Sequence, residues 1–297
     1  MRRRAALIFV PVLALFFFCA RCNAQAAPLE DAKKSILARI EKSGAEVGIA
    51  FRTLDGKDEW YSRAAESFHA ASTMKVPVLI ELFHQVKDGK LKLSDSLVVR
   101  NEFRSIVEGS PYNLDAADDS EADLYKAEGQ TRTISQLAEL MITVSSNLAT
   151  NLLIEKLGVE NIRATVHSLG ADGMNVLRGV EDGKAFEKGM NNTTTARGLA
   201  TLMTAIADGK AVDPESSQQM VAILERQKFN EAIPAGLPAG TRVAHKTGDI
   251  TKVHHDAAIV FAKRPFVLVI LVRGIAEDKE AYKLIAAIAS DLYNATN

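Results

Sequence analysis

Three β-rich runs near the C-terminus place the strongest constraint on the fold. They read "TRVAHKTG" (241–248), "HHDAAIVFA" (254–262) and "FVLVILVRG" (266–274), with short links between them. Short links join antiparallel neighbours, so these runs predict an antiparallel meander. Near the other end, "EVGIAFRTL" (46–54) and "EWYS" (59–62) alternate like strands on either side of a "DGKD" hairpin turn. We expect these two strands to join the meander in one sheet.

Helical patterns fill the middle of the chain and its end. Apolar residues recur at i, i+3 and i+4, as they do on the buried face of a helix. The predicted helices are 73–86, 134–146, 148–158, 159–170, about 194–207, about 214–226 and about 278–294. Residues 101–131 and 178–192 are polar and irregular, and we interpret the acidic run in the first of them as a solvated face.

The order of these elements predicts an α/β (α+β) fold. An antiparallel sheet is flanked by helices, and an all-helical domain is interleaved with it. We expect the α/β part to take about residues 27–68 and 214–297, and the helical part about 69–213.

The first 26 residues have the pattern of a cleaved secretory signal. "MRRR" is followed by an apolar run and by an Ala-x-Ala site, Ala24 to Ala26, with cleavage before Ala27. The apolar run contains Pro11 and is shorter than the ~20 residues of a membrane span. We therefore expect a secreted or periplasmic protein without stable membrane insertion; an uncleaved anchor is the alternative.

Cysteine content and charge exclude several kinds of site. Cys19 and Cys22 both lie in the predicted signal, so the mature chain, 271 of the 297 residues, has no cysteine for a disulfide, a nucleophile or a metal. The signal also removes four arginines and no acid, which leaves 32 basic and 37 acidic residues, a net charge of −5. This balance argues against a nucleic-acid-binding face, and we expect no cofactor.

Ser72 and Lys75 stand where a polar stretch gives way to an apolar helix. Side chains three residues apart share a helix face, and the first turn has free N–H donors and a positive field. Burial lowers the pKa of a lysine, so a neutral Lys75 could take the proton of a nucleophilic Ser72. The alternative is a capping serine beside a lysine that reaches to solvent.

Two further patterns complete a set. Ser145-Ser146-Asn147 lies at a predicted corner between helices, and Lys246-Thr247-Gly248 ends a predicted strand. Each alone suits a helix cap or an exposed strand. The ordered set Ser-x-x-Lys, Ser-x-Asn, Lys-Thr-Gly resembles that of the serine β-lactamase and penicillin-binding protein superfamily. The separations are similar to those of the secreted class A β-lactamases, and the resemblance covers essentially the whole mature chain.

The resemblance implies a β-lactamase/transpeptidase-like fold and an acyl-transfer site. Ser72 would attack the carbonyl carbon and carry the acyl group, with Lys75 as base or proton relay. Ser145 would pass a proton to the leaving nitrogen and bridge Lys75 and Lys246.

Further residues would bind the substrate. Asn147 would hydrogen-bond its side-chain amide, and Lys246 and Thr247 would bind its carboxylate. Gly248 would let the substrate lie close to the strand because it has no side chain. The backbone N–H groups of Ser72 and Asp249 would form an oxyanion hole, in which one donor is typically worth ~2.7–4 kcal/mol.

Two residues depart from the family pattern. The family usually has Ser-Asp-Asn where this chain has Ser146 in the middle, and we expect little loss because that residue points away from the substrate. Asp249 replaces a small or hydroxyl residue. Its carboxylate would repel the substrate's carboxylate unless its side chain turns away.

The base for deacylation is less clearly marked. The family carries it as Glu in an Arg-x-Glu-x-x-Leu-Asn loop, whereas this chain has "RGVEDGKAFEKGMNN". Arg178 fits, Glu181 is one residue late, and Asp182 and Glu187 are also within reach by sequence. We select Glu181, with a purely structural role as the alternative.

The "HHD" motif at 254–256 does not indicate a metal site. Neighbouring strand residues point to opposite faces, so His254 and His255 cannot easily share one ion.

Three functions are compatible with these residues. The first is a hydrolase that opens β-lactam rings. The second is a D-alanyl-D-alanine peptidase with a peptidoglycan-like substrate, and the third is a penicillin-binding sensor that keeps its acyl group. Length and a single compact plan favour the first, and the irregular loop at Glu181 favours the other two. We expect a monomer acting on a small molecule.

Overall fold

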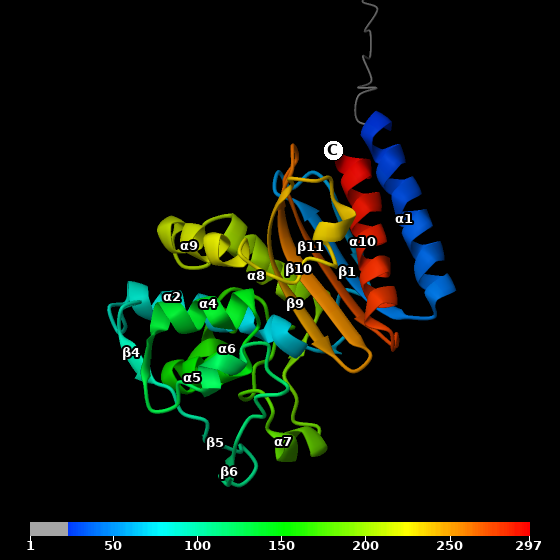
Figure 1. Ribbon diagram of the computed structural model, residues 1–297. Helices are drawn as coiled ribbons and strands as arrows, with labels where there is room; N and C mark the ends of the chain where they lie inside the picture. Colours follow the sequence, from blue (N-terminus) through cyan, green and yellow to red (C-terminus); the bar gives the residue numbers. More distant parts are fainter. Residues whose placement is uncertain (1–22) are drawn as a thin grey trace, which may run out of the picture.

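The computed structural model describes residues 23–297, and one antiparallel sheet of five strands forms its frame (Figure 1). The strand order is β2-β1-β11-β10-β9. The strands are β1 (Glu46–Thr53), β2 (Glu59–Ser62), β9 (Arg242–Ile250), β10 (Val253–Phe261) and β11 (Phe266–Arg273). The predicted hairpin and meander are confirmed to within a few residues.

The first strand pairs with the last, which joins the two ends of the chain in one sheet. Ile49 lies opposite Ile270 in the β1–β11 ladder, and Lys246 lies opposite Ala257 in the β10–β9 ladder. β9 is an edge strand, so half of its backbone N–H and C=O groups face away from the sheet. The α+β fold predicted from the sequence is therefore confirmed.

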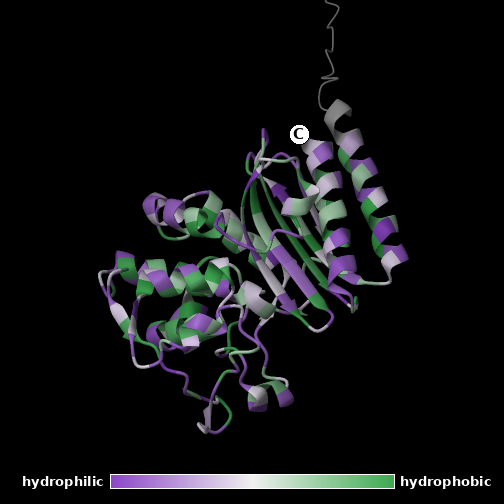
Figure 2. Cartoon of the chain, viewed as in Figure 1, coloured by the Kyte–Doolittle hydropathy of each residue, from purple (hydrophilic) through white to green (hydrophobic). Residues whose placement is uncertain are grey.

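Two long helices cover one face of the sheet, α1 (Asn23–Ser43) and α10 (Asp278–Thr296). Their apolar side chains meet the sheet in one cluster that contains Ile36, Phe51 and Leu284. Figure 2 shows hydrophobic residues along the central strands and a mixture of hydrophobic and hydrophilic residues on both helices. Helix α10 matches its prediction, but α1 had no predicted counterpart.

Residues 1–22 of the predicted signal, which spans residues 1–26, lie outside the described residues. Among the described residues, no helix is long and apolar enough to cross a membrane.

The other face of the sheet carries the remaining core. Helix α8 packs on β1, β10 and β11, and the other helices stack beyond it (Figure 1). These helices are α2 (Lys75–Lys87), α4 (Ile134–Thr143), α5 (Asn147–Leu157), α6 (Val159–Ser168), α8 (Ala196–Ala207) and α9 (Pro214–Leu224). The predicted helices are present, with ends that differ by up to three residues.

Side-chain caps explain where several of these helices begin. Thr133 and Gln136 form a capping box at α4. Thr195 accepts the Gly198 N–H at the start of α8, and Asp213 caps α9, which has proline at its first position.

The segments predicted to be irregular contain only short elements. They are β5 (Phe103–Arg104), β6 (Pro111–Tyr112), α3 (Ala122–Tyr125) and α7 (Gly183–Glu187). Two short paired strands, β4 (Ser96–Val98) and β7 (Thr131–Thr133), flank the first segment. Two further short strands, β3 (Phe68–His69) and β8 (Thr193–Thr194), pair with each other beside the 3₁₀ turn η1 (Ala71–Met74). A second 3₁₀ turn, η2 (Pro234–Gly236), lies against α10.

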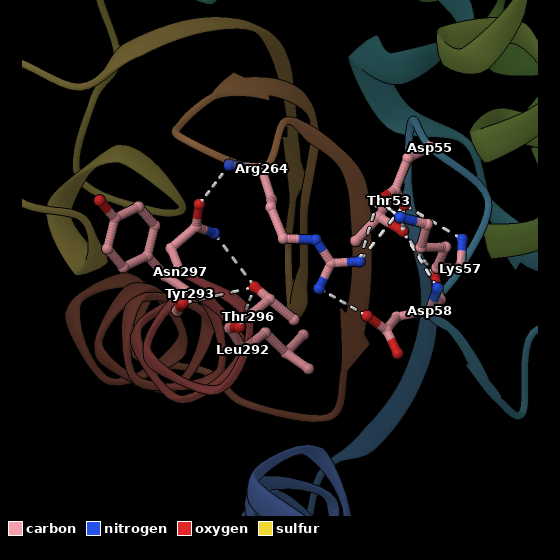
Figure 3. Close-up of polar contacts among 9 residues, drawn as sticks. All are labelled: Thr53, Asp55, Lys57, Asp58, Arg264, Leu292, Tyr293, Thr296 and Asn297. Atoms are coloured by element: carbon pink, nitrogen blue, oxygen red, sulfur yellow. Dashed lines mark hydrogen bonds and ion pairs between the residues drawn. The ribbon is translucent and has the colours of Figure 1, made fainter. Parts of the chain in front are cut away.

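Arg264, in the turn between β10 and β11, ties three parts of the sheet layer together (Figure 3). Its guanidinium lies 2.7 Å from the Asp58 carboxylate and 3.2 Å from that of Asp55, both in the β1–β2 turn. Its backbone N–H donates to Asn297 Oδ1 at 2.6 Å. The sheet end far from the candidate site is thus fixed to the C-terminal helix.

Candidate active site

The predicted nucleophile lies in a tight turn rather than in the helix itself. Ser72 is in η1, and α2 begins three residues later at Lys75. Ala71 has φ of 45°, a left-handed conformation that residues other than glycine rarely adopt. His69 Nδ1 accepts the Ala71 N–H at 3.0 Å, and His255 Nε2 donates to the His69 carbonyl at 2.9 Å.

The two histidines stay neutral in this arrangement. Burial lowers the pKa of His69, and full burial lowers that of His255 to about 4. His255 accepts the Val272 N–H at Nδ1 at 3.2 Å while it donates at Nε2, which only a neutral ring can do. The strained turn before Ser72 is therefore held by the sheet.

Ser72 lies between two adjoining pockets. One has a volume of about 580 Å³ and is also lined by Asn147, Glu181 and Phe186. The other has a volume of about 400 Å³ and is also lined by Asn147 and Thr247. A substrate bound at Ser72 can thus extend in both directions.

Lys75 is completely buried beside the nucleophile turn. Its Nζ lies 2.6 Å from the Ser145 carbonyl oxygen, 3.1 Å from Ser145 Oγ and 2.9 Å from Asn147 Oδ1. Burial, followed by the charge of Lys246, holds the pKa of Lys75 well below its usual range. A lysine in this state can accept a proton from a neighbouring hydroxyl.

Ser145 lies between the two lysines. Lys246 Nζ donates to Ser145 Oγ at 3.1 Å and to the Thr247 carbonyl at 2.9 Å. Burial lowers the pKa of Lys246 to about 8, although the charges of Asp249 and Asp256 oppose the shift. Ser145 therefore connects a lysine with a strongly lowered pKa to one that is largely protonated at neutral pH.

Asn147 links this group to Glu181. Asn147 Nδ2 donates to Glu181 Oε1 at 2.7 Å, and the Asp115 N–H donates to Oε2 at 3.4 Å. Burial raises the pKa of Glu181, which also has a left-handed φ of 61°. Buried Asn151 holds the preceding residue by accepting the Val180 N–H at 2.7 Å and donating to its carbonyl at 3.1 Å.

The other two carboxylates considered for this role lie elsewhere. Asp182 is buried and accepts from Ser105 Oγ and the Ile106 N–H, both at 2.9 Å, while it also caps α7. Glu187 is exposed at the end of α7. Of the three, only Glu181 is hydrogen-bonded to the predicted site residues.

Gly248 brings the edge strand against the nucleophile turn. A Cβ atom there would lie 3.0 Å from the Thr73 nitrogen and 3.1 Å from the Ser72 nitrogen. A side chain would therefore push β9 away from η1. The lack of a side chain at Gly248, expected to leave room for the substrate, thus also allows the edge strand to approach the nucleophile turn.

Comparison with known proteins decides the family. A family model described as "Beta-lactamase enzyme family" matches residues 30–296, which is most of the chain. The chain belongs to this β-lactamase family. The resemblance in the sequence motifs pointed to the same superfamily.

Individual relatives are distant but cover most of the chain. The extended-spectrum β-lactamase PER-1 of Pseudomonas aeruginosa is 25% identical over 295 residues, which are 95% of this chain and 92% of that protein. The β-lactamase of Sphaerobacter thermophilus superposes with a TM-score of 0.78 at 26% identity, covering 89% of this chain and 96% of that one. For PBP-A the TM-score is 0.75 at 28% identity, covering 89% and 95%.

The side chain of Asp249 turns toward α10, one of the two helices that cover the sheet. Tyr282 donates to Asp249 Oδ1 at 2.9 Å, and His254 Nδ1 lies 3.1 Å from the same oxygen. The Asp249 side chain keeps 37% of its surface exposed and lines both pockets, and burial of the rest raises its pKa. These contacts hold the carboxylate toward α10, while Asp249 still lines both pockets.

Within the part of the chain that the structure describes, no three His, Cys, Asp or Glu side chains are placed to hold a metal ion. His254 and His255 point to different partners, Asp249 and the His69 carbonyl.

One residue that contacts the candidate site was missed from the sequence. The acidic run in 101–131 was interpreted as a solvated face, which is wrong for Asp119, whose exposure is 8%. Asp119 contacts the Ser145–Asn147 corner. The surrounding acids masked it, and only the buried hydrophobic neighbours Leu114 and Leu124 offered a signal.

Proposed function

We propose that this protein is a secreted serine hydrolase that opens β-lactam rings through an acyl-enzyme on Ser72. The observation that carries the proposal is the continuous set of contacts Lys246–Ser145–Lys75–Asn147–Glu181 beside the pockets at Ser72. Membership of the β-lactamase family supports it.

In the acylation step, Ser72 Oγ bonds to the carbonyl carbon of the lactam, and neutral Lys75 takes the proton that Ser72 loses. The backbone N–H groups of Ser72 and Asp249 stabilise the oxyanion. When the C–N bond breaks, Ser145 gives its proton to the nitrogen and recovers one from Lys246 or Lys75, with which it is in contact.

In the deacylation step, Glu181 takes a proton from a water molecule that attacks the ester carbon. The ester C–O bond breaks, the Ser72 oxygen takes up the proton that Glu181 received from the water, and both groups return to their starting states. Asn147 holds Glu181 and Lys75 at fixed positions, so the two bases are oriented by one amide.

A penicillin-binding protein that keeps its acyl group is the second candidate. Glu181 departs from the family spacing, and a variant of PBP-A, whose acyl-enzyme complex with penicillin G has been solved, superposes with a TM-score of 0.76 at 29% identity. A time course of nitrocefin hydrolysis separates the two. Steady turnover supports the hydrolase, whereas one equivalent of product followed by no further turnover supports the second candidate.

Secretion is tested by the mass of the protein recovered from the periplasm or medium of an expressing bacterium. A chain beginning at Ala27 is expected. A membrane-bound chain that retains residues 1–26 would contradict it.

Substitution of Gly248 by alanine should slow acylation by about 10²-fold, because a displacement near 1 Å at a reacting group has effects of that size. The added Cβ meets backbone nitrogen atoms of the nucleophile turn, which cannot rotate away. The rate of labelling by a fluorescent penicillin measures the effect. Gly183→Ala, whose added Cβ meets no atom within 4 Å, is the matched control. Parental labelling of Gly248→Ala would show that the close approach is unimportant.

The affinity for penicillins should fall as the pH rises through about 8. Lys246, whose pKa burial lowers to about 8, is charged below that pH and neutral above it. The proposed charge pair with the substrate carboxylate is therefore present at low pH and lost at high pH. KM for benzylpenicillin should rise across this range, whereas KM for its methyl ester should change little. Equal changes for both substrates would contradict carboxylate binding by Lys246.

A further inference from the structure

The corner between α4 and α5 is held by a carboxylate from another part of the chain. Ser145 has φ of 60°, and Ser146 is the N-cap of α5. The first backbone N–H groups of a helix have no partner within the helix and need acceptors from outside. Ser146 Oγ accepts only one of them, the Ala149 N–H, at 3.2 Å.

Asp119 accepts the two N–H groups that precede that of Ala149 in the helix. Its Oδ2 accepts the Asn147 N–H at 2.8 Å and the Leu148 N–H at 2.9 Å. The same oxygen lies 3.3 Å from Ser146 Oγ and 3.0 Å from the Tyr125 hydroxyl. A negative charge at a helix N-terminus is also favoured by the helix dipole.

The second oxygen of Asp119 fixes its own loop. Oδ1 accepts the Glu121 N–H at 3.0 Å, so both oxygens are engaged by N–H donors. Asp119 is 8% exposed and Ser146 is 0% exposed, which leaves little room for another arrangement. One carboxylate therefore ties the 101–131 segment to the start of α5.

The residues on either side of this cap hold the proposed base. The Ser145 carbonyl and hydroxyl and the Asn147 amide oxygen make the three hydrogen bonds of Lys75 Nζ. We propose that Asp119 is a positioning residue for acylation, whose carboxylate orients Ser145 and Asn147 around Lys75. This inference rests on the proposed function of Ser72 and Lys75.

The carboxylate of Asp119 lies where an aspartate at residue 146 would otherwise place its own. Ser146 stands where the family pattern has aspartate, and its hydroxyl lies 3.3 Å from the Asp119 oxygen. A carboxylate at residue 146 would thus contact that of Asp119, and two like charges at this distance repel. The two positions together accommodate one carboxylate.

Asparagine at residue 119 cannot reproduce the contacts. An amide has one acceptor oxygen, so Asp119→Asn turns an NH₂ group either toward the Glu121 N–H or toward the α5 amides. We expect labelling of Ser72 by a fluorescent penicillin to slow by about 10- to 100-fold. Asp123→Asn, on an exposed aspartate of the same segment, is the control and should label at the parental rate.

The paired substitution gives the sharper test. Ser146→Asp alone should also slow labelling, because it places two carboxylates together. In Asp119→Asn with Ser146→Asp one carboxylate is restored at the cap, and aspartate is as good an N-cap as serine. The double variant should therefore label faster than either single variant. Additive losses in the double variant would overturn the inference.

The pH profile separates positioning from a general loss of structure. Lys75 is faced by Lys246 and by the carboxylates of Asp119 and Glu181, and the charge of Asp119 opposes the lowering of its pKa by burial and by Lys246. Removing that charge lowers the pKa of Lys75 further. The acid limb of the labelling rate should then shift to lower pH in Asp119→Asn, and an unshifted limb with a parental rate would overturn the inference.

Hydrogen exchange tests the cap without using activity. The Asn147 and Leu148 amides should exchange faster in Asp119→Asn. In the double variant the Leu148 amide should recover, because an aspartate at the N-cap accepts from the second or third N–H group of the helix. Unchanged exchange in Asp119→Asn would refute the inference. If the parent is not labelled at Ser72 at all, the proposed function fails, and the exchange experiment still decides whether Asp119 holds the corner.

Discussion

Ser72→Ala will abolish covalent labelling by a fluorescent penicillin and reduce kcat/KM for nitrocefin by about 10⁴-fold or more, as expected for loss of a nucleophile. The Ser72 hydroxyl lines both pockets, and its turn is held by contacts of His69 and Ala71 that the substitution leaves intact. The variant should therefore unfold at the parental temperature.

Ser120→Ala is a matched control for this variant. Ser120 is an exposed serine that lines the smaller pocket, so it offers a hydroxyl without a neighbouring buried lysine. It should label like the parent. Undiminished labelling of Ser72→Ala, with loss in Ser120→Ala, would remove Ser72 from the mechanism.

Glu181→Gln should trap the acyl-enzyme. Glutamine keeps an oxygen that can accept from Asn147 Nδ2, the 2.7 Å contact of Glu181, and loses only the 3.4 Å contact with the Asp115 N–H, so the base is removed while the shorter contact is kept. General-base help is typically worth ~10²–10⁴-fold, and deacylation should slow by that amount while acylation is kept. Intact-protein mass spectrometry after mixing with benzylpenicillin should show an adduct on most of the protein.

The control for Glu181→Gln is Glu187→Gln, because Glu187 is exposed at the end of α7 and should turn over normally. Asp182→Asn is unsuitable, since Asp182 is buried and holds Ser105 and the start of α7. Adduct in Glu187→Gln with normal turnover in Glu181→Gln would contradict the assignment of this loop. A parent that itself stays acylated would favour the penicillin-binding sensor.

The sheet was predictable because its central strands are nearly continuous runs of apolar residues. β11 reads as eight residues that are almost all apolar and buried, a pattern that needs cover on both faces. Helix α1 was missed for the opposite reason. Only four of its 21 residues are large and apolar, Leu29, Ile36, Leu37 and Ile40, and its first four residues belong to the predicted signal.

The site was predictable where motif and local structure coincide. Lys75, Ser145, Asn147 and Lys246 are brought into hydrogen-bonding contact, as the motifs suggested, although their roles remain predictions. Contacts between distant segments were not readable. Asp119 reaches α5 from 28 residues upstream, and no periodicity in the sequence marks such a contact.

Glu181 shows a different limit. Its spacing from Arg178 departs from the family loop, so sequence alone left three acids to choose from. The left-handed backbone at Glu181 and the amide of Asn151 direct its side chain toward Asn147. These are tertiary constraints, which local sequence does not encode.

The central claim is that hydrolysis passes through an ester on Ser72. Mixing the parent protein with benzylpenicillin, quenching in acid at increasing times and mapping the modified peptide by mass spectrometry tests it most directly. The account predicts an adduct of one penicillin on Ser72 that forms before steady turnover and disappears when the substrate is consumed. Hydrolysis with no adduct at any time, or an adduct on a different residue, would contradict it.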